Sequence, residues 1–336
     1  MKTHKTASSA VQNIFLRQAL ISNYSVAIGR WDWARLCYWA RFDRSCLYNR
    51  DSIPLDMMMH HLRYNKQEVA SSLSPNATYI TILRHPRSLI HSAFEYFEWK
   101  NVFGTWENYT RSFAKMKLAI DTINNVPFRN LMLYDFGLEV SEMDADDAVE
   151  ALVEHVHSRF DVVMLQEYMH ESLVLLRHTL NWSYEDVAVF EVNKISHKES
   201  GVQSAKEAMT AVDWWNRQDL RLYNRLHGKF QRQIENFGHK KMAAEVEVLK
   251  QVIAEIRQHC IKSESIGQME TDQHGEVQYE LTEAGNSSVN CWCLTSSEHK
   301  LTRILWRKAY IERIFRKKVH VDLLPTLQDS RLHYTT

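Results

Sequence analysis

Five consecutive residues near the start of the chain, Lys5-Thr6-Ala7-Ser8-Ser9, combine a cation, three hydroxyl groups and a small side chain. The residues that follow carry apolar side chains at helical spacing, so these five precede or begin an expected helix. The first turn of a helix offers unpaired N–H groups and the positive end of the helix dipole to an anion. The segment therefore predicts a phosphate-binding loop; an ordinary helix cap with a surface lysine is the alternative.

A second pair of phosphate-binding side chains is expected after residues 78–83, because the sequence TYITIL predicts a buried strand. Arg84 follows this strand, Pro86 suits the first turn of the next helix, and Ser92 lies about two turns into that helix. A guanidinium and a hydroxyl group placed in this way can hold a phosphate. Alone, the pattern favours a salt bridge and a helix-face serine. With the first loop, it predicts a nucleotide that carries phosphates at both ends.

The elements around these residues indicate an α/β fold. A second buried strand is expected at 161–165, and seven acids without Lys or Arg in 139–154 indicate a solvated helix face or loop. Short strands that alternate with helices favour a parallel sheet, and ligands of such sheets bind beyond the carboxyl ends of the strands. Helices are expected at 7–20, 87–99, 110–124, 170–180 and, with breaks near Gly228 and Gly238, at 204–260.

Composition narrows the class of protein. The 336 residues include 41 basic and 41 acidic side chains, and this balance argues against a generic nucleic-acid binder. Only 9 Gly and 5 Pro occur, well below average usage, so the chain should be rich in helix. The patterns G-x-G-x-x-G and G-x-x-x-x-G-K-[ST] do not occur, which argues against a kinase-like nucleotide site. Neither a long apolar run typical of a membrane-spanning helix nor a signal peptide is visible.

The cysteines and the glycosylation sequons say little about chemistry. Five cysteines allow at most two disulfides and leave one thiol over. Cys291-x-Cys293 lacks a second pair of ligands, so no zinc site is expected. Five N-x-[ST] sequons are weak evidence for a secreted glycoprotein, and they begin at Asn23, Asn76, Asn108, Asn181 and Asn286.

The composition changes after residue 260. Residues 261–300 are polar and predict a linker or an irregular excursion. Residues 301–318 are basic and carry an apolar stripe, so 301–336 is expected to be a basic amphipathic C-terminal segment. Two interpretations of 301–318 remain open: a helix docked on the catalytic domain, or a helix that lies on an anionic membrane surface.

The phosphate-binding segments and several downstream motifs together resemble the galactose-3-O-sulfotransferases. The resemblance extends from about residue 2 to about residue 260, and the first loop combined with Glu167–Leu176 makes it specific. The similar motifs are Thr3–Ser9 with Val11-Gln12-Asn13-Ile14, Ile82–Pro86 with Ser92 and Phe94-x-Tyr96-Phe97, Asn130-Leu131 with Asp135-Phe136-Gly137, Gln166–Leu176, Asp186-Val187, and Phe237-Gly238 with Met242 and Glu245-Val246.

The resemblance implies a P-loop NTPase-like sulfotransferase fold over residues 1–260, with a central parallel sheet flanked by helices and a first strand truncated at the N-terminus. It implies transfer of a sulfuryl group from 3′-phosphoadenosine 5′-phosphosulfate to the 3-hydroxyl of a terminal galactose on a glycolipid or glycoprotein, with no metal. Lys5 would neutralise the bridging and 5′-phosphate oxygens. The other donor contacts would be Thr6, Ala7, Ser8 and Ser9 at the 5′-phosphate and Arg84 and Ser92 at the 3′-phosphate.

A sugar hydroxyl needs a general base near neutral pH. The resemblance implies His61 for this role, because a His–apolar–Arg–aromatic segment precedes the strand at 78–83, and the adjacent His60 is the alternative. Arg63 is a candidate for orienting the acceptor or the sulfonate. Glu167 is a candidate for binding sugar hydroxyls or for acting as a second base; a buried carboxylate paired with a basic residue is the other interpretation.

The family further implies the lumenal side of the Golgi membrane, although no signal anchor precedes the loop in this chain. The alternative function is a non-catalytic relative that binds glycans or membranes. The short N-terminus and the basic C-terminal segment motivate this alternative.

Overall fold

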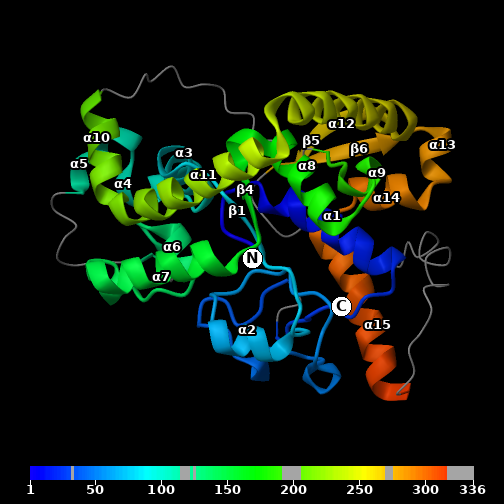
Figure 1. Ribbon diagram of the computed structural model, residues 1–336, viewed down its shortest axis with the longest axis horizontal. Helices are drawn as coiled ribbons and strands as arrows, with labels where there is room; N and C mark the ends of the chain where they lie inside the picture. Colours follow the sequence, from blue (N-terminus) through cyan, green and yellow to red (C-terminus); the bar gives the residue numbers. More distant parts are fainter. Residues whose placement is uncertain (32–33, 114–121, 124–125, 191–205, 269–274, 316–336) are drawn as a thin grey trace.

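The computed structural model describes residues 1–31, 34–113, 122–123, 126–190, 206–268 and 275–315 (Figure 1). The strands are β1 (Ile80–Leu83), β2 (Thr122–Ile123), β3 (Val126–Pro127), β4 (Val162–Leu165), β5 (Ile261–Gln268) and β6 (Gly275–Leu281). The α-helices are α1 (Ser8–Ile21), α2 (Lys66–Ser72), α3 (Pro86–Tyr96), α4 (Lys100–Phe103), α5 (Trp106–Ser112), α6 (Leu131–Asp135), α7 (Asp146–Arg159), α8 (Met169–Leu180), α9 (Tyr184–Val187), α10 (Lys206–Trp215), α11 (Arg217–Phe237), α12 (His239–Cys260), α13 (Glu283–Asn286), α14 (Val289–Thr295) and α15 (Glu298–Phe315). Short 3-10 helices cover Arg44–Cys46, Arg50–Ser52, Val140–Glu142 and Gln166–Tyr168.

A small parallel sheet lies at the centre of the fold. β1 and β4 run parallel, with Ile80 opposite Val162, and their apolar side chains are buried, as expected for strands covered on both faces. Residues 1–3 run along the other edge of β1, where the Thr3 hydroxyl donates to the Ile82 carbonyl. Lys2 also pairs in parallel with His61. The backbone that leads into α1 therefore reaches the same edge of the sheet as the carboxyl end of β1.

Helices cover this sheet and share one apolar core with it. α8 and α11 pack against β4, and α12 packs against α8 (Figure 1). The core joins Ile14 of α1, Leu83 of β1, Val163 of β4 and Leu176 of α8. The expected helix-rich α/β architecture with a parallel sheet is confirmed.

Most of the predicted elements are present. The strands expected at 78–83 and 161–165 are β1 and β4, and the helices expected at 7–20, 87–99 and 170–180 are α1, α3 and α8. The helices expected over 204–260 are α10, α11 and α12; residues 204 and 205 lie outside the described residues.

Two predicted details are wrong. Gly238 ends α11 with a φ of 93°, as expected, whereas Gly228 lies inside α11 and does not break it. A glycine in a helix costs only about 1 kcal/mol relative to alanine, which the packing of α11 offsets. The helix expected at 110–124 is also wrong where it can be judged, because α5 ends at Ser112 and residues 122–123 form β2. Residues 114–121 and 124 lie outside the described residues.

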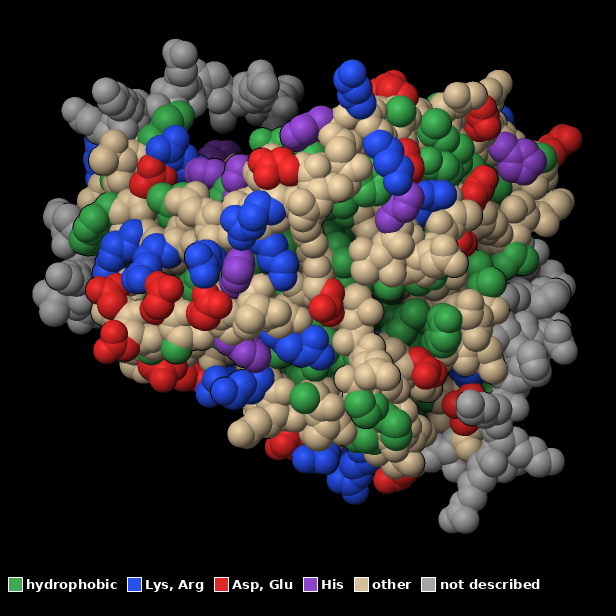
Figure 2. All heavy atoms as spheres, in the orientation of Figure 1, with side chains coloured by type: hydrophobic (Ala, Val, Ile, Leu, Met, Phe, Trp, Pro, Cys, Tyr) green, Lys and Arg blue, Asp and Glu red, His purple; other side chains and the backbone are tan. Residues whose placement is uncertain are grey.

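The acidic residues in 139–154 lie on the surface and face a row of arginines. Arg217, Arg221 and Arg225 of α11 form ion pairs with acids in and just before α7, and Figure 2 shows these basic and acidic rows side by side. Most of these side chains are well exposed, so each pair contributes about 0–1 kcal/mol. Hydrogen bonding to Arg129 lowers the pKa of Asp144, at one end of the row, to about 2.

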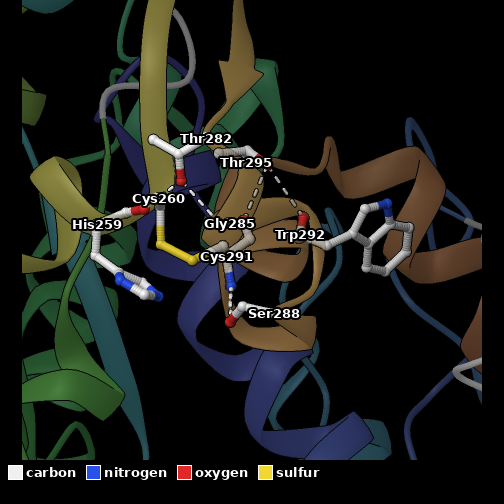
Figure 3. Close-up of a disulfide and its surroundings, with 8 residues drawn as sticks. All are labelled: His259, Cys260, Thr282, Gly285, Ser288, Cys291, Trp292 and Thr295. Atoms are coloured by element: carbon white, nitrogen blue, oxygen red, sulfur yellow. Dashed lines mark hydrogen bonds between the residues drawn. A yellow bond between two sulfur atoms is a disulfide. The ribbon is translucent and has the colours of Figure 1, made fainter.

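The segment 261–300, expected as a polar linker or an irregular excursion, contains an antiparallel hairpin of β5 and β6 followed by α13 and α14. A disulfide joins Cys260, the last residue of α12, to Cys291 of α14, and so ties together the segments on either side of the hairpin (Figure 3). There the N–H of Thr282 donates to the Cys260 carbonyl over 3.0 Å. Most polar side chains of β5 are exposed, so the composition that suggested a linker belongs to a solvated hairpin. A second disulfide joins Cys37 and Cys46, and Cys293 is a buried free thiol, which matches the cysteine count.

α15 docks on α1. Leu301, Leu305 and Ala309 pack with Leu16 and Leu20 of α1 in a second apolar cluster. Residues 316–336, the rest of the expected C-terminal segment, lie outside the described residues. None of the helices in the described ranges is long and apolar enough to cross a membrane.

We expect Gly137→Ala to lower the free energy of unfolding by about 3–5 kcal/mol, because strain at positive φ and a steric clash add together. Gly137 has a φ of +92°, and a Cβ there would lie 2.0 Å from the Tyr64 carbonyl oxygen. Gly238→Ala is the matched control, since its φ is +93° and a Cβ would meet nothing within 4 Å. The control should cost about 1–2 kcal/mol. Urea unfolding of both variants measures the difference, and equal losses would contradict the clash.

Candidate functional site

A cavity of about 1000 Å³ lies at the carboxyl ends of β1 and β4. Arg84, which follows β1, and Gln166, which follows β4, both line it. The sequence-predicted residues that line the cavity are Lys5, Ala7, Ser8, Ser9, His61, Arg84 and Ser92. The two predicted phosphate-binding segments thus come together in one cavity, at the edge of the sheet where ligands of parallel sheets bind.

The loop before α1 has a strained backbone. Lys5 and Ala7 have left-handed φ angles of 59° and 61°. Two hydroxyl groups hold this conformation: that of Thr6 donates to the Thr3 carbonyl over 3.1 Å, and that of Ser8 donates to the same oxygen over 2.6 Å. Thr6 is fully buried and does not line the cavity. Thr6 therefore shapes the loop without reaching the cavity, whereas Ser8 both holds the loop and lines the cavity together with Ser9. Strain of this kind occurs at functional sites when the surroundings fix it.

Arg84 connects the two segments that the sequence predicts to bind phosphate. Its guanidinium donates to the Lys5 carbonyl over 3.1 Å and to the Ser88 hydroxyl over 3.1 Å. The Lys5 ammonium lies 3.7 Å from the centre of the Tyr96 ring, which places it beside α3. Burial lowers the pKa of Arg84 and the Glu167 carboxylate raises it, and an arginine remains cationic at neutral pH. Two cations therefore lie at the cavity wall.

Two stacked imidazoles form another part of the wall. The rings of His4 and His61 lie 3.9 Å apart, centre to centre, at an angle of 18°. Burial, and then the neighbouring His4, hold the pKa of His61 well below its usual value, and its Nδ1 has no hydrogen-bond partner among the described residues. His60 points into the core, where its Nδ1 contacts Gln12 over 2.8 Å and burial lowers its pKa to about 4. Of the two adjacent histidines, His61 is the one that lines the cavity.

His4 is held by a buried carboxylate. Its Nδ1 lies 3.0 Å from Asp135 Oδ1, and its backbone N–H donates to Asp135 Oδ2 over 2.7 Å. The hydroxyl of Tyr38 also donates to Asp135. A carboxylate can only accept, so His4 Nδ1 carries a proton, and in the neutral imidazole Nε2 is the acceptor. Sequence reasoning did not select His4, although it precedes Lys5 directly and Asp135 lies in one of the motifs.

The motif around Asp135 positions that carboxylate. Asn130 precedes α6 with a left-handed φ of 51°. The Asp219 carboxylate accepts the N–H groups of Met132 and Leu133 over 3.0 and 2.9 Å at the start of α6. Burial raises the pKa of Asp219 to about 7. Residues 130–137 therefore position His4 through Asp135, but they do not themselves line the cavity.

The two candidate acceptor residues do not line the cavity. The Arg63 guanidinium donates to the Leu138 carbonyl over 3.0 Å and forms an ion pair with Glu139, so it is buried in the protein framework. Glu167 is exposed and accepts the N–H of His85 over 2.6 Å. The interpretation of Glu167 as a buried carboxylate is therefore wrong. Its bond to His85 holds the chain next to Arg84.

The remaining wall comes from parts of the chain that sequence reasoning did not select. Phe190 and Tyr279 lie 5.8 Å apart, ring centre to ring centre, and the Arg257 guanidinium lies 5.9 Å from each ring. Arg257 belongs to α12, and Tyr279 belongs to the hairpin that lies between the two cysteines of the disulfide in Figure 3. The polar composition of 261–300 gave no signal for this role. In the described part of the chain, no group of three His, Cys, Asp or Glu side chains is arranged to hold a metal.

These observations define an α/β protein with a cavity at the carboxyl end of a parallel sheet, and Lys5 and Arg84 lie in the wall of that cavity. The chain belongs to the galactose-3-O-sulfotransferase family, because the sequence profile of that family matches residues 1–284. The resemblance found in the motifs is thereby confirmed.

Named relatives agree with this family. The galactosylceramide sulfotransferase of Mus musculus is 36% identical over 272 residues, which cover 78% of this chain and 63% of that protein. Galactose-3-O-sulfotransferase 2 of Homo sapiens is 30% identical over 268 residues, which cover 78% of this chain and 67% of that protein. The aligned part of the chain thus spans about 63% of the first of these relatives. No solved structure matches the protein significantly.

Proposed function

We propose that the protein transfers a sulfuryl group from 3′-phosphoadenosine 5′-phosphosulfate to the 3-hydroxyl of a terminal galactose. The observation that carries this proposal is the single cavity that Lys5, Ser9, Arg84 and Ser92 line together. Two phosphate-binding groups in one cavity suit a nucleotide with phosphates on both its 3′ and 5′ sides. The names of the relatives specify galactose and galactosylceramide, which supports a galactose-terminated glycolipid or glycan as the acceptor.

The fold we propose is the P-loop NTPase-like sulfotransferase fold. Residues 1–3 run beside β1, the loop at 4–7 turns, and α1 begins at Ser8, so the order is extended segment, anion-binding loop and helix. This order is the one in which helix N-termini bind phosphates in α/β proteins. We retain the division into a sulfotransferase domain at 1–260 and two C-terminal segments at 261–300 and 301–336 as part of the proposal.

Donor binding rests on the charges at the cavity wall. Sulfuryl transfer, like phosphoryl transfer, needs an aligned nucleophile and stabilisation of the charge that develops on the leaving phosphate. Lys5, Ser9 and the first turn of α1 supply that stabilisation at the 5′-phosphate. Arg84 and Ser92 bind the 3′-phosphate, which distinguishes this donor from ATP. The bond from Arg84 to the Lys5 carbonyl fixes the distance between the two groups. No step requires a metal in this scheme.

We assign activation of the galactose hydroxyl to the stacked imidazoles of His4 and His61. His61 is neutral at pH 7 because its pKa is depressed, so it can accept the proton of the galactose hydroxyl. We add His4 to the predicted site, since Asp135 orients it and leaves Nε2 as an acceptor. Arg63 and Glu167 are not retained as acceptor-binding residues.

Residence on the lumenal side of the Golgi membrane is part of the proposal. Two disulfides, Cys37–Cys46 and Cys260–Cys291, support it, because disulfides persist in oxidising compartments. Contact of 301–318 with a membrane surface also belongs to the proposal; residues 316–318 lie outside the described residues.

Binding of adenosine 3′,5′-bisphosphate tests the proposal. A ligand at 100 times its dissociation constant stabilises the folded state by about 2.7 kcal/mol, so the nucleotide should raise the melting temperature measurably. ATP should give a smaller shift, because it has no 3′-phosphate for Arg84. Arg84→Ala should lose most of the shift, whereas the exposed Arg44→Ala should retain it. Equal shifts with ATP and the bisphosphate, or none with either, would contradict the proposed donor.

A further inference from the structure

α15 has two faces of different character. Its inner face carries the apolar side chains that pack on α1. Both acids between residues 298 and 312 also have partners near the protein: Glu298 accepts from Lys2 and Ser9, and Glu312 pairs with Lys308 of the same helix. Docking of α15 therefore uses its apolar side chains and Glu298, whereas the Glu312–Lys308 pair lies within the helix itself.

The outer face is basic and aromatic. Lys300 and Arg307 are exposed, and Arg303 is half-buried between them along the same face. Trp306 is half-buried at the border of this face, where it packs against the apolar cluster and Tyr48, and it stacks on Tyr310 one turn further with ring centres 5.4 Å apart and planes at 25°. The Tyr310 side chain is 43% exposed. This face, defined by these five residues, is called the outer face below.

Two large side chains at and just after the end of α1 are exposed near α15. Ile21, the last residue of α1, is 60% exposed and Tyr24 is 37% exposed. The Lys308 ammonium donates to the Tyr24 carbonyl over 3.4 Å, which fixes this segment next to α15. Large exposed apolar and aromatic side chains next to cations are typical of protein surfaces that lie on a membrane.

We propose that the outer face of α15 binds the surface of an anionic lipid bilayer. Lysine and arginine are attracted to anionic headgroups, and Trp and Tyr rings favour the interface between headgroups and acyl chains. The whole chain has 41 basic and 41 acidic side chains, so it has no net charge that would draw it to any polyanion. Attraction to an anionic surface must therefore be local. In the sequence, Arg316, Lys317 and Lys318 follow α15; they lie outside the described residues.

This inference deepens the membrane contact of the proposed function, but it does not rest on the chemistry of the cavity. The protein can bind the nucleotide without binding vesicles, or bind vesicles without binding the nucleotide, so the two proposals are tested separately. It also reconciles the two interpretations of 301–318 given by the sequence. The inner face docks on the catalytic part of the protein, and the outer face remains for the lipid.

Sedimentation of the full chain with vesicles tests the inference. We expect binding to phosphatidylcholine vesicles that contain phosphatidylserine, little binding to phosphatidylcholine alone, and release at high salt. Lys300→Glu/Arg307→Glu should lower the partition coefficient by about 30-fold or more, because each basic residue near an anionic surface contributes about fivefold. Tyr310→Ala should weaken binding to the same vesicles at every salt concentration.

The matched control is Lys66→Glu/Lys240→Glu, which changes the net charge equally at two exposed lysines on α2 and α12. It should bind like the wild type, and all variants should keep the wild-type melting temperature. Equal binding to both vesicle types, or equal losses in the two double variants, would overturn the inference. Binding to soluble heparin without binding to vesicles would also overturn it, because the surface would then recognise an acidic polymer.

Discussion

Under the proposed function, we expect Lys5→Ala to lower kcat for sulfuryl transfer by about 100- to 1000-fold, the usual cost of removing one group that stabilises charge in the transition state. The Lys5 ammonium lies at the cavity wall beside Tyr96, and its carbonyl is tied to Arg84, so the charge is fixed before the reaction begins. Lys5→Arg should not restore the rate, because a planar guanidinium cannot occupy the position of a compact ammonium. Transfer from a labelled donor to a panel of galactosides measures the loss.

Lys240→Ala is the control, since Lys240 is an exposed lysine of α12 away from the cavity lining, and it should transfer at the wild-type rate. The thermal shift with adenosine 3′,5′-bisphosphate should remain detectable in Lys5→Ala, because Ser9, Arg84 and Ser92 are intact. A wild-type kcat in Lys5→Ala would remove the lysine from the mechanism. Loss of both folding and binding in this variant would show that Lys5 supports the loop structurally.

The cavity of the proposed donor site could be located from sequence because the signals of its two segments are local. A helix start after Lys5 and a strand end before Arg84 are visible in short windows, and parallel strands bring their carboxyl ends together. The sequence does not show in which direction each side chain of these segments points. The Thr6 side chain points inward because its hydroxyl donates to the Thr3 carbonyl. This contact depends on the left-handed backbone at Lys5 and Ala7.

The environment of the His4 and His61 imidazoles depends on contacts between residues far apart in the sequence, which residue spacing cannot predict. His4 and Asp135 are 131 residues apart in the sequence, and their contact requires residues 1–3 to lie beside β1 and α6 to begin at Leu131. The motif around Asp135 is visible in the sequence. The role of its carboxylate follows only from the contact with His4, which the sequence does not show.

The wall formed by the C-terminal part was missed for a different reason. Composition reflects the average exposure of a segment, and the described side chains of the hairpin, at 261–265 and 277–281, are mostly exposed. Its contribution to the cavity comes from a few side chains such as Tyr279, which project from one face of the hairpin. A two-stranded hairpin is marginal by itself, and here the disulfide between Cys260 and Cys291 ties together the segments on either side of it.

His61→Ala is expected to lower kcat by about 100- to 10 000-fold, which is the range for removing a general base. Burial and the neighbouring His4 keep the pKa of His61 below its ordinary value, so the imidazole is unprotonated at pH 7. Activity is then lost as the pH falls through that depressed pKa. The acid limb of kcat/KM in the wild type should therefore lie below pH 6.5, with a plateau from there to pH 8.

His4→Asn separates the roles of the two imidazoles. Because His4 is a cause of the depressed pKa of His61, its removal should move the acid limb towards higher pH if His61 is the base. If His4 is the base, His4→Asn should lose as much activity as predicted for His61→Ala. In that case Asp135→Asn should also reduce kcat, since the asparagine no longer fixes the proton on Nδ1 of His4.

His239→Ala, at an exposed histidine at the start of α12, serves as the control and should leave the pH profile unchanged. Each variant should keep its thermal shift with the bisphosphate, which shows that the donor site is folded. An unchanged kcat in both His61→Ala and His4→Asn would exclude the stacked pair as the source of the base. The proton of the galactose hydroxyl would then have to leave by way of another cavity group, for which His170 is the remaining histidine of the lining.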